Sequence, residues 1–232
     1  MKTIGMLGGM SWESTQTYYR LANQRVRDRL GGLHSAKIVL YSVDFAQIEA
    51  LQHAGEWARM AEILGSAAQA VEAAGAELLV ICTNTMHKVA PEIAAAVGIP
   101  LVHIADATAE VLSRDGVAKV GLLGTRFTME QPFYKERLQA HGLQVVTPDE
   151  PGREDVHRII YSELCRGDIN PDSRERFLAI IETLRQQGAE AVILGCTEIG
   201  LLVSQADTSV RLYDTTEIHV ERAVEKALGR VD

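Results

Sequence analysis

Short apolar runs alternate along this chain with longer stretches whose apolar residues recur at helical spacing. The runs are continuous, which is typical of strands that are buried on both faces of a parallel sheet. Glycines follow many of these segments, where they favour turns and helix ends. Strands that alternate with helices of about ten or more residues predict an α/β protein whose parallel sheets are covered by helices on both faces.

The predicted strands are apolar segments bounded by turn residues: 3–7, 37–41, 77–81, 100–102, 119–123, 142–146, 191–194 and 210–213. The predicted helices have the longer period: 12–30, 45–55, 56–74, 89–96, 106–113, 129–140, 154–165, 171–187 and 215–228. Residues 148–152 are expected to form a loop. Four side chains are expected to cap or open helices: Ser11, Asp44, Thr128 and Thr215.

Three short motifs recur at nearly the same spacing, which indicates an internal duplication. The matched segments are 4–8 with 120–124, Gly75-Ala76-Glu77 with Gly188-Ala189-Glu190, and Cys82-Thr83 with Cys196-Thr197. An apolar strand that ends in glycine is common to all α/β units and explains the first pair alone. The sequence therefore predicts two similar lobes related by a pseudo-two-fold axis. Residues 1–100 with 208–232 form the first lobe, and residues 101–207 form the second.

Each lobe has an apolar strand that stops at a cysteine, Cys82 or Cys196, followed by small polar residues. This pattern places each sulfur at the carboxyl edge of a sheet, where open α/β sheets bind their ligands. A pseudo-dyad would bring the two thiols to opposite sides of one cleft. One thiolate could then remove a proton from a carbon while the other thiol returns a proton to the opposite face, which is the chemistry of a racemase or epimerase.

Residues beside these cysteines offer groups for a substrate carboxylate. A helix that begins after each cysteine is expected to lower the thiol pKa and attract an anion. Hydroxyl, amide and backbone donors are expected to bind the carboxylate and stabilise the enolate-like charge of the reaction: Thr83, Asn84, Thr85, Thr125 and Thr197. Glu198 is interpreted as orienting a neighbouring base or binding the substrate amine, with a surface acid at a helix start as the alternative.

The remaining cysteine and two histidines have less specific patterns. Cys165 lies near a predicted helix end and is interpreted as structural. His87 could pair with Cys82 as the base of a thiol hydrolase, or it could cap or orient the segment. His103 is interpreted as a buried histidine with satisfied hydrogen bonds. No Cys/His set has metal-binding spacing, and Gly8-Gly9 does not match a phosphate loop, so no metal or cofactor is expected.

Composition narrows the partners and the location. The 232 residues carry a formal charge of −8, which argues against nucleic acid or an anionic membrane as the main partner. Three scattered cysteines favour a reducing compartment, and we expect a cytoplasmic protein. No apolar segment approaches the roughly 20 residues that span a bilayer, and the N-terminus does not have the pattern of a signal peptide.

Several motifs resemble the aspartate/glutamate racemase family over essentially the whole chain. The resembling segments are 6–14 (MLGGMSWES), 43–45 (VDF), 82–88 (CTNTMHK), 103–106 (HIAD), 123–129 (LGTRFTM) and 195–199 (GCTEI). Within the family, the broad-specificity amino-acid racemase branch is the most similar. Glutamate racemases carry histidine after the second Cys-Thr, where this chain has Glu198.

The resemblance implies two flavodoxin-like lobes with the active site in the cleft between them, and a dimer. It implies a cofactor-independent amino-acid racemase with Cys82 and Cys196 as its acid/base pair. It also implies that Thr83, Asn84, Thr85 and Thr125 contact the substrate carboxylate, and that Met10 and Gln52 line the cleft. Aspartate-specific members grip the side-chain carboxylate with a basic residue and a lysine. Here the first region reads Leu51-Gln52-His53, and no lysine occurs between Lys135 and Lys226, so Arg153, His157 and Arg158 are the candidate replacements.

We therefore predict a racemase of small amino acids, acidic ones included. One alternative is another superfamily activity on a small dicarboxylate, either cis–trans isomerisation or decarboxylation. A thiol hydrolase would need only one cysteine and would form a covalent acyl adduct. A two-lobed binding module would hold amino acids without turnover and would not need the second thiol.

Overall fold

The computed structural model describes residues 1–229, which form two compact units. The first unit contains residues 1–104 and the segment that begins at His219, and the second contains residues 105–218. The chain therefore leaves the first unit and returns to it. The return to the first unit comes later in the chain than the sequence predicts. Strand β7 (Arg211–Asp214) pairs with β6 (Ala191–Gly195) in the second sheet, so residues 208–218 lie in the second unit.

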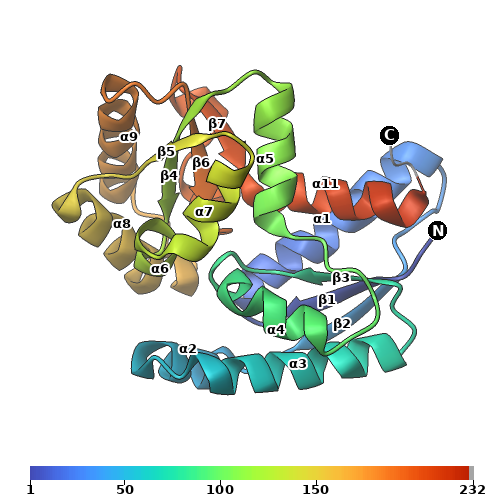
Figure 1. Ribbon diagram of the computed structural model, residues 1–232. Helices are drawn as coiled ribbons and strands as arrows, with labels where there is room; N and C mark the ends of the chain where they lie inside the picture. Colours follow the sequence, from blue (N-terminus) through green and yellow to red (C-terminus); the bar gives the residue numbers. More distant parts are fainter. Residues whose placement is uncertain (230–232) are drawn as a thin grey trace. The chain divides into compact units, whose positions relative to one another are not determined.

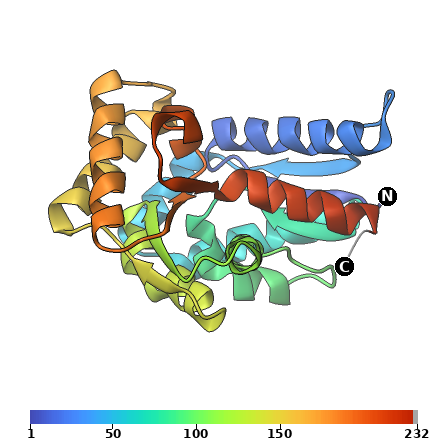
Figure 2. The ribbon, with the colours of Figure 1, turned by 90° about the horizontal axis from the view of Figure 1, so that it is seen from above.

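The first unit is built on a parallel three-stranded sheet with strand order β2-β1-β3. Its strands are β1 (Ile4–Gly8), β2 (Ile38–Ser42) and β3 (Leu78–Ile81). One apolar cluster joins the sheet to α2 (Phe45–Ala54), α3 (Trp57–Ala73) and α4 (Ala90–Ala95). A second cluster joins the other face to α1 (Trp12–Leu30) and α11 (Thr215–Leu228), which run side by side (Figures 1 and 2). The sheet is therefore covered on both faces, which confirms the predicted α/β class.

The second unit is built on a parallel four-stranded sheet with order β5-β4-β6-β7. The two strands not yet bounded are β4 (Lys119–Gly124) and β5 (Gln144–Val146). Its helical segments are α5 (Ile104–Arg114), α6 (Arg126–Glu130), α7 (Pro132–Ala140), α8 (Glu150–Ser162), η2 (Leu164–Arg166), α9 (Pro171–Gln186), α10 (Ile199–Leu202) and η3 (Gln205–Asp207). Helices α8 and α9 share one apolar cluster with the sheet, and α5 and α7 lie on its other side (Figure 1).

The two sheets repeat one design, and the repeated Gly-Ala-Glu motif has the same role in both. The Glu77 carboxylate accepts a hydrogen bond from the Thr3 backbone N–H at 2.9 Å, just before β1. The Glu190 carboxylate accepts one from the Ala118 N–H at 3.0 Å, just before β4. In both units the glutamate follows a glycine with positive φ, at the end of the helix that precedes β3 or β6. This equivalence supports the duplication inferred from the sequence.

Several helix boundaries differ from the expected ones because other side chains provide the caps. The helix predicted at 129–140 is two helices, since Gln131 is extended and Pro132 starts α7. Thr125, rather than Thr128, caps the first of these helices. Helix α8 begins at Glu150, within the predicted 148–152 loop, because the Asp149 side chain caps it. The predicted strand at 100–102 is reduced to an isolated bridge between Leu79 and Leu101.

Two predicted helix starts are confirmed. Ser11 accepts a hydrogen bond from the Ser14 N–H at the start of α1, and Asp44 caps α2. The prediction that Thr215 caps α11 is wrong, because its hydroxyl donates to the Leu194 carbonyl. The capping contact comes from Asp214, whose carboxylate accepts the Thr216 N–H at 2.7 Å. Among residues 1–229, no helix combines the length and apolar character that a membrane span requires.

Candidate functional site

Cys82 is held at the carboxyl end of β3 by contacts from two neighbouring elements. Its backbone N–H donates to the Leu7 carbonyl of β1 at 2.9 Å. Its own carbonyl accepts the Ser14 hydroxyl of α1 at 2.8 Å. The side chain is fully buried within the apolar cluster formed with α1 and α11. The sequence did not single out Ser14 as a support for this cysteine, although the Ser11-x-x-Ser14 spacing marked the helix start where it lies.

The polar residues after Cys82 turn directly into a short 3₁₀ helix, η1 (Thr85–Val89). Asn84 and Thr85 are buried, and Thr83 is half-buried. The His87 ring fixes the turn, since Nδ1 lies 2.8 Å from the Thr83 carbonyl and Nε2 accepts the Ile104 N–H at 3.3 Å. An N–H can only donate, so Nε2 has no proton and Nδ1 donates to Thr83. His87 therefore orients this loop, and both of its ring nitrogens bind backbone groups rather than the Cys82 thiol.

The two other candidates in the first unit, Met10 and Gln52, are buried. Met10 follows β1 and belongs to the apolar cluster that contains Met86 of the loop after Cys82. Gln52 lies on α2. The Gly9 N–H donates to the Thr15 hydroxyl at 2.8 Å, which holds the turn between β1 and α1. Met10 and this loop therefore contribute to the same apolar cluster of the first unit.

Three histidines cluster behind this loop in the first unit. The His87 ring lies 4.6 Å from that of His103 and 5.7 Å from that of His219, measured between centroids. His103 is buried, as expected. His219 lies 2.7 Å from the Val102 carbonyl through Nε2 and 2.8 Å from the Tyr18 hydroxyl through Nδ1. A carbonyl can only accept, so Nε2 carries the ring proton and donates it to Val102. Nδ1 then has no proton and accepts the Tyr18 hydroxyl, so the neutral ring satisfies both contacts.

Acid is expected to destabilise the protein through His219. Burial lowers the pKa of His219 to about 4, with a smaller opposing contribution from the hydrogen bond to Val102. Because its folded pKa lies below the unfolded value of about 6.5, its contribution to stability is full above pH 6.5 and is lost as the pH falls toward 4. We expect this group to account for a loss of about 2 kcal/mol between pH 7.5 and 5.0.

Urea unfolding at the two pH values, with wild type and His219→Gln, measures this contribution. The variant should lose less free energy of unfolding on acidification than the wild type by about that amount. The comparison removes contributions from other groups, such as Asp214. Burial raises the pKa of Asp214 to about 6. An equal loss in both proteins would contradict the assignment.

In the second unit, Cys196 and Thr125 begin the loops at two adjacent strand ends. Gly124 of β4 and Gly195 of β6 are paired in register, and each precedes one of these residues. The Thr125 hydroxyl accepts the Thr128 N–H at 3.4 Å and lies 3.3 Å from the Thr128 hydroxyl. The structure thus places Thr125 beside the Cys196 loop, with a capping role in addition to the predicted substrate contact.

Glu198 is the polar centre of the Cys196 loop. Its Oε2 accepts the Cys196 thiol at 3.0 Å and the Thr197 hydroxyl at 2.6 Å. Its Oε1 lies 4.0 Å from the Cys165 sulfur of η2. The side chain is only 3% exposed, which rules out the surface-acid alternative. Cys165 is near this loop because η2 packs against α10. Sequence spacing alone does not predict this contact.

The expectation that helix N-termini lower the thiol pKa values is wrong. Burial raises the pKa of Cys82 and of Cys196, and the negative charge of Glu198 raises that of Cys196 further. The helices after the two cysteines are the single 3₁₀ segment η1 and the four-residue α10, which are too short to offset the burial of a charge. Burial therefore favours the protonated form of each thiol.

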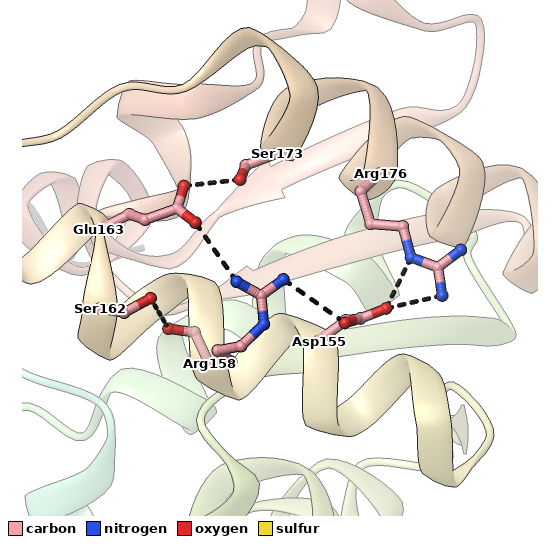
Figure 3. Close-up of polar contacts among 6 residues, drawn as sticks. All are labelled: Asp155, Arg158, Ser162, Glu163, Ser173 and Arg176. Atoms are coloured by element: carbon pink, nitrogen blue, oxygen red, sulfur yellow. Dashed lines mark hydrogen bonds and ion pairs between the residues drawn. The ribbon is translucent and has the colours of Figure 1, made fainter.

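The three candidates for gripping a substrate side chain have other partners in the second unit. Arg153 pairs with Glu130 at 2.9 Å and donates to the Pro148 carbonyl. Arg158 lies 3.5 Å from both Asp155 and Glu163, within a network that includes Arg176 and Ser173 (Figure 3). The His157 Nδ1 accepts the Arg126 backbone N–H at 3.2 Å. Arg153 therefore contacts the loop after β5, and His157 contacts the start of α6, directly after β4.

Metal-ligating side chains do not converge within the described part of the chain. Among residues 1–229, no group of three or more His, Cys, Asp or Glu side chains has an arrangement that could hold a metal ion. Each unit does offer one buried thiol, Cys82 beside an amide-bearing turn in the first and Cys196 beside a carboxylate in the second. These groups can donate and accept protons.

Comparisons with known proteins agree with the motifs. A family model described as Asp/Glu/hydantoin racemase matches residues 7–223. A crystal structure of a candidate Asp/Glu racemase from Yersinia pestis is 56% identical, with a TM-score of 0.92 over 98% of this chain and 100% of that one. An aspartate racemase homologue from Pyrococcus horikoshii OT3 is 38% identical, with a TM-score of 0.86 and the same coverage.

A functionally named relative is similar over most of its length. The broad-specificity amino-acid racemase RacX of Bacillus subtilis is 23% identical over 225 residues, which are 92% of each chain. The family match includes both cysteine-bearing strands, and the resemblance inferred from the motifs is confirmed. With its two parallel sheets and a match over nearly its whole length, this chain belongs to the Asp/Glu/hydantoin racemase family and is an isomerase of the racemase type.

Proposed function

We propose that this protein is a cofactor-independent amino-acid racemase that uses Cys82 and Cys196 as acid and base at Cα. The observation that carries the proposal is the equivalence of the two thiols. Cys82 follows β3, which pairs with the central strand β1, and Cys196 follows β6, which pairs with the central strand β4. A duplicated thiol has no purpose in a one-nucleophile enzyme but is required by two-base racemisation.

In the proposed reaction, one cysteine enters as thiolate and removes the proton from Cα. The other cysteine enters as thiol and donates its proton to the opposite face of the carbanion. Donors around the substrate carboxylate stabilise the enolate-like charge, for which Thr83, Asn84 and Thr85 are the candidates in the first unit and Thr125 in the second. Met10 and Gln52 are proposed to line the substrate site. After release of the product, proton exchange with solvent restores the starting protonation state.

The substrate is proposed to be a small amino acid, with aspartate and glutamate included. The names of the relatives span aspartate racemase and broad-specificity racemase. Strict recognition of a side-chain carboxylate has less support, since Arg153 and Arg158 already pair with carboxylates of the protein. Broad specificity therefore fits the observed contacts better than a dedicated aspartate site.

A thiol hydrolase is less well supported than a racemase. Its base would be His87, but both ring nitrogens of His87 bind backbone groups. Cis–trans isomerisation or decarboxylation of a small dicarboxylate remains the alternative within the superfamily. A panel that includes maleate and malonates beside amino acids separates these reactions from racemisation.

A homodimer in the cytoplasm is part of the proposal. Among residues 1–229 the three cysteines form no disulfide, which fits a reducing compartment. The edge strand β2 exposes Leu40 and Tyr41, and α1 exposes Trp12 and Tyr19. These apolar side chains would suit contact with a second copy of the chain.

A racemisation screen in deuterated water tests the function. Each L- and D-amino acid is incubated with the protein as purified, without added pyridoxal phosphate, and the products are separated by chiral chromatography. At least one amino acid should racemise, and the newly formed enantiomer should contain deuterium at Cα. Turnover without deuterium in the product, or no turnover of any amino acid alongside turnover of maleate or a malonate, would contradict the proposal.

A further inference from the structure

The two thiols have different neighbours, although the strands that carry them are equivalent. Two positions after Cys82 the chain has Asn84, and two positions after Cys196 it has Glu198. The Glu198 carboxylate accepts the Cys196 thiol at 3.0 Å, and its side chain is 3% exposed. A buried carboxylate that accepts a thiol hydrogen is positioned to take the proton itself.

Burial creates a problem that this contact can solve. Burial raises the pKa of Cys196, which makes release of the thiol proton to water unfavourable. Transfer of the proton from Sγ to Oε2 leaves the pair with the same total charge of minus one. The transfer therefore avoids most of the cost of creating a new charge in a buried site.

We propose that Glu198 is a positioning residue that receives the thiol proton of Cys196 and so prepares Cys196 to act as the base. This inference rests on the proposed racemase function. In the step, the S–H bond of Cys196 breaks and an O–H bond forms on Glu198. The Cα–H bond then breaks as the Cys196 S–H bond re-forms, and Cys82 donates its proton to the opposite face. Cys82 is left as thiolate, and solvent carries the proton of Glu198 back to it after the product leaves.

Neighbouring groups fit this role. Thr197 donates to the same oxygen at 2.6 Å, which holds that oxygen in place beside the Cys196 thiol. The other titratable groups near the loop are Cys165 of η2, with its sulfur 4.0 Å from Oε1, and Asp214, whose carboxylate lies against Gly200 of α10.

The test compares Glu198→Gln with Glu198→Asp and a matched control. Glutamine keeps the size of the side chain but cannot take a proton, so kcat should fall at least about 100-fold. Aspartate should restore part of the activity. In Glu198→Gln, the rise of kcat/KM with pH should move by more than about one unit to higher pH, because Cys196 must then ionise without the carboxylate. The control is Glu163→Gln, which removes another carboxylate of this unit. Glu163 accepts a hydrogen bond from Ser173 and lies near Arg158 (Figure 3). The kcat of this variant should stay within about twofold of the wild-type value.

The outcomes separate this inference from the proposed function. Wild-type activity and an unchanged pH profile in Glu198→Gln, with an inactive Cys196→Ala, would overturn the inference alone. An active Cys196→Ala would overturn both. If Glu198→Gln does not fold, Thr197→Val provides the test, since the carboxylate loses the hydrogen bond that holds it beside the Cys196 thiol. The value of kcat should then fall more than about tenfold with a smaller change in KM, and an unchanged kcat would overturn the inference.

Discussion

Replacing either Cys82 or Cys196 by alanine is expected to lower kcat for racemisation by about 1,000-fold or more. Each variant retains one thiol and can serve only one face of Cα, while two-base racemisation needs both faces. General acid–base groups typically contribute about 10²–10⁴-fold to the rate. Because two enantiomers have equal free energy, kcat/KM should fall by the same factor in both directions. Chiral chromatography of reactions started from each enantiomer measures the loss.

Cys165→Ala is the matched control, since it removes the third thiol of the chain. Its sulfur is 4.0 Å from the Glu198 carboxylate, so we expect only a small effect, within about tenfold. Circular dichroism and the thermal midpoint verify that all three variants are folded. A Cys82→Ala protein that racemises at the wild-type rate would contradict the two-base mechanism.

Gly9→Ala is expected to destabilise the protein by about 3 kcal/mol or more and to abolish activity. Gly9 has φ of +90°, and a Cβ there would meet the Val43 carbonyl oxygen and lie 2.6 Å from the Val43 nitrogen. The turn cannot yield easily, since the Gly9 N–H is bonded to Thr15 and the Val43 N–H to the Gly8 carbonyl. Movement of this turn would displace Met10. Urea unfolding measures the loss.

Gly55→Ala separates steric conflict from backbone strain. Gly55 also has positive φ, +74°, but a Cβ there would have no neighbour within 4 Å. Only the conformational cost remains, which is about 1 kcal/mol. If the two variants lose the same free energy of unfolding, the close approach of Val43 does not constrain the turn.

The fold class was predictable because its signals are local. Continuous apolar runs identified all the paired strands, and the capping residues Ser11 and Asp44 marked helix starts correctly. The duplication was visible because its anchors have defined roles, such as the carboxylates of Glu77 and Glu190 that bind the backbone before each central strand. Errors arose where local preferences compete. Thr125 and Thr128 both suit a helix start, and the structure uses Thr125.

The electrostatics of the site could not be predicted from the sequence. Proximity to a helix start suggested lowered thiol pKa values, but burial depends on packing among distant segments and has the opposite effect. The same packing brings η2 against α10 and so places Cys165 beside Glu198. Spacing identified Glu198 as a candidate, but only the 3.0 Å contact with Cys196 indicates what it can do. The sequence also makes Arg158 a candidate for substrate recognition, but it cannot show that Arg158 lies beside Asp155 and Glu163.

Exchange of the Cα proton by the two single-cysteine variants tests the central claim most directly. A variant with one thiol can still remove a proton and return a deuteron to the same face in deuterated water. We therefore predict that Cys82→Ala labels one enantiomer of the substrate and Cys196→Ala labels the opposite enantiomer, each without inversion, as measured by mass spectrometry after chiral separation. Labelling of the same enantiomer by both variants would show that the two thiols do not act on opposite faces of one carbon, and would contradict the account.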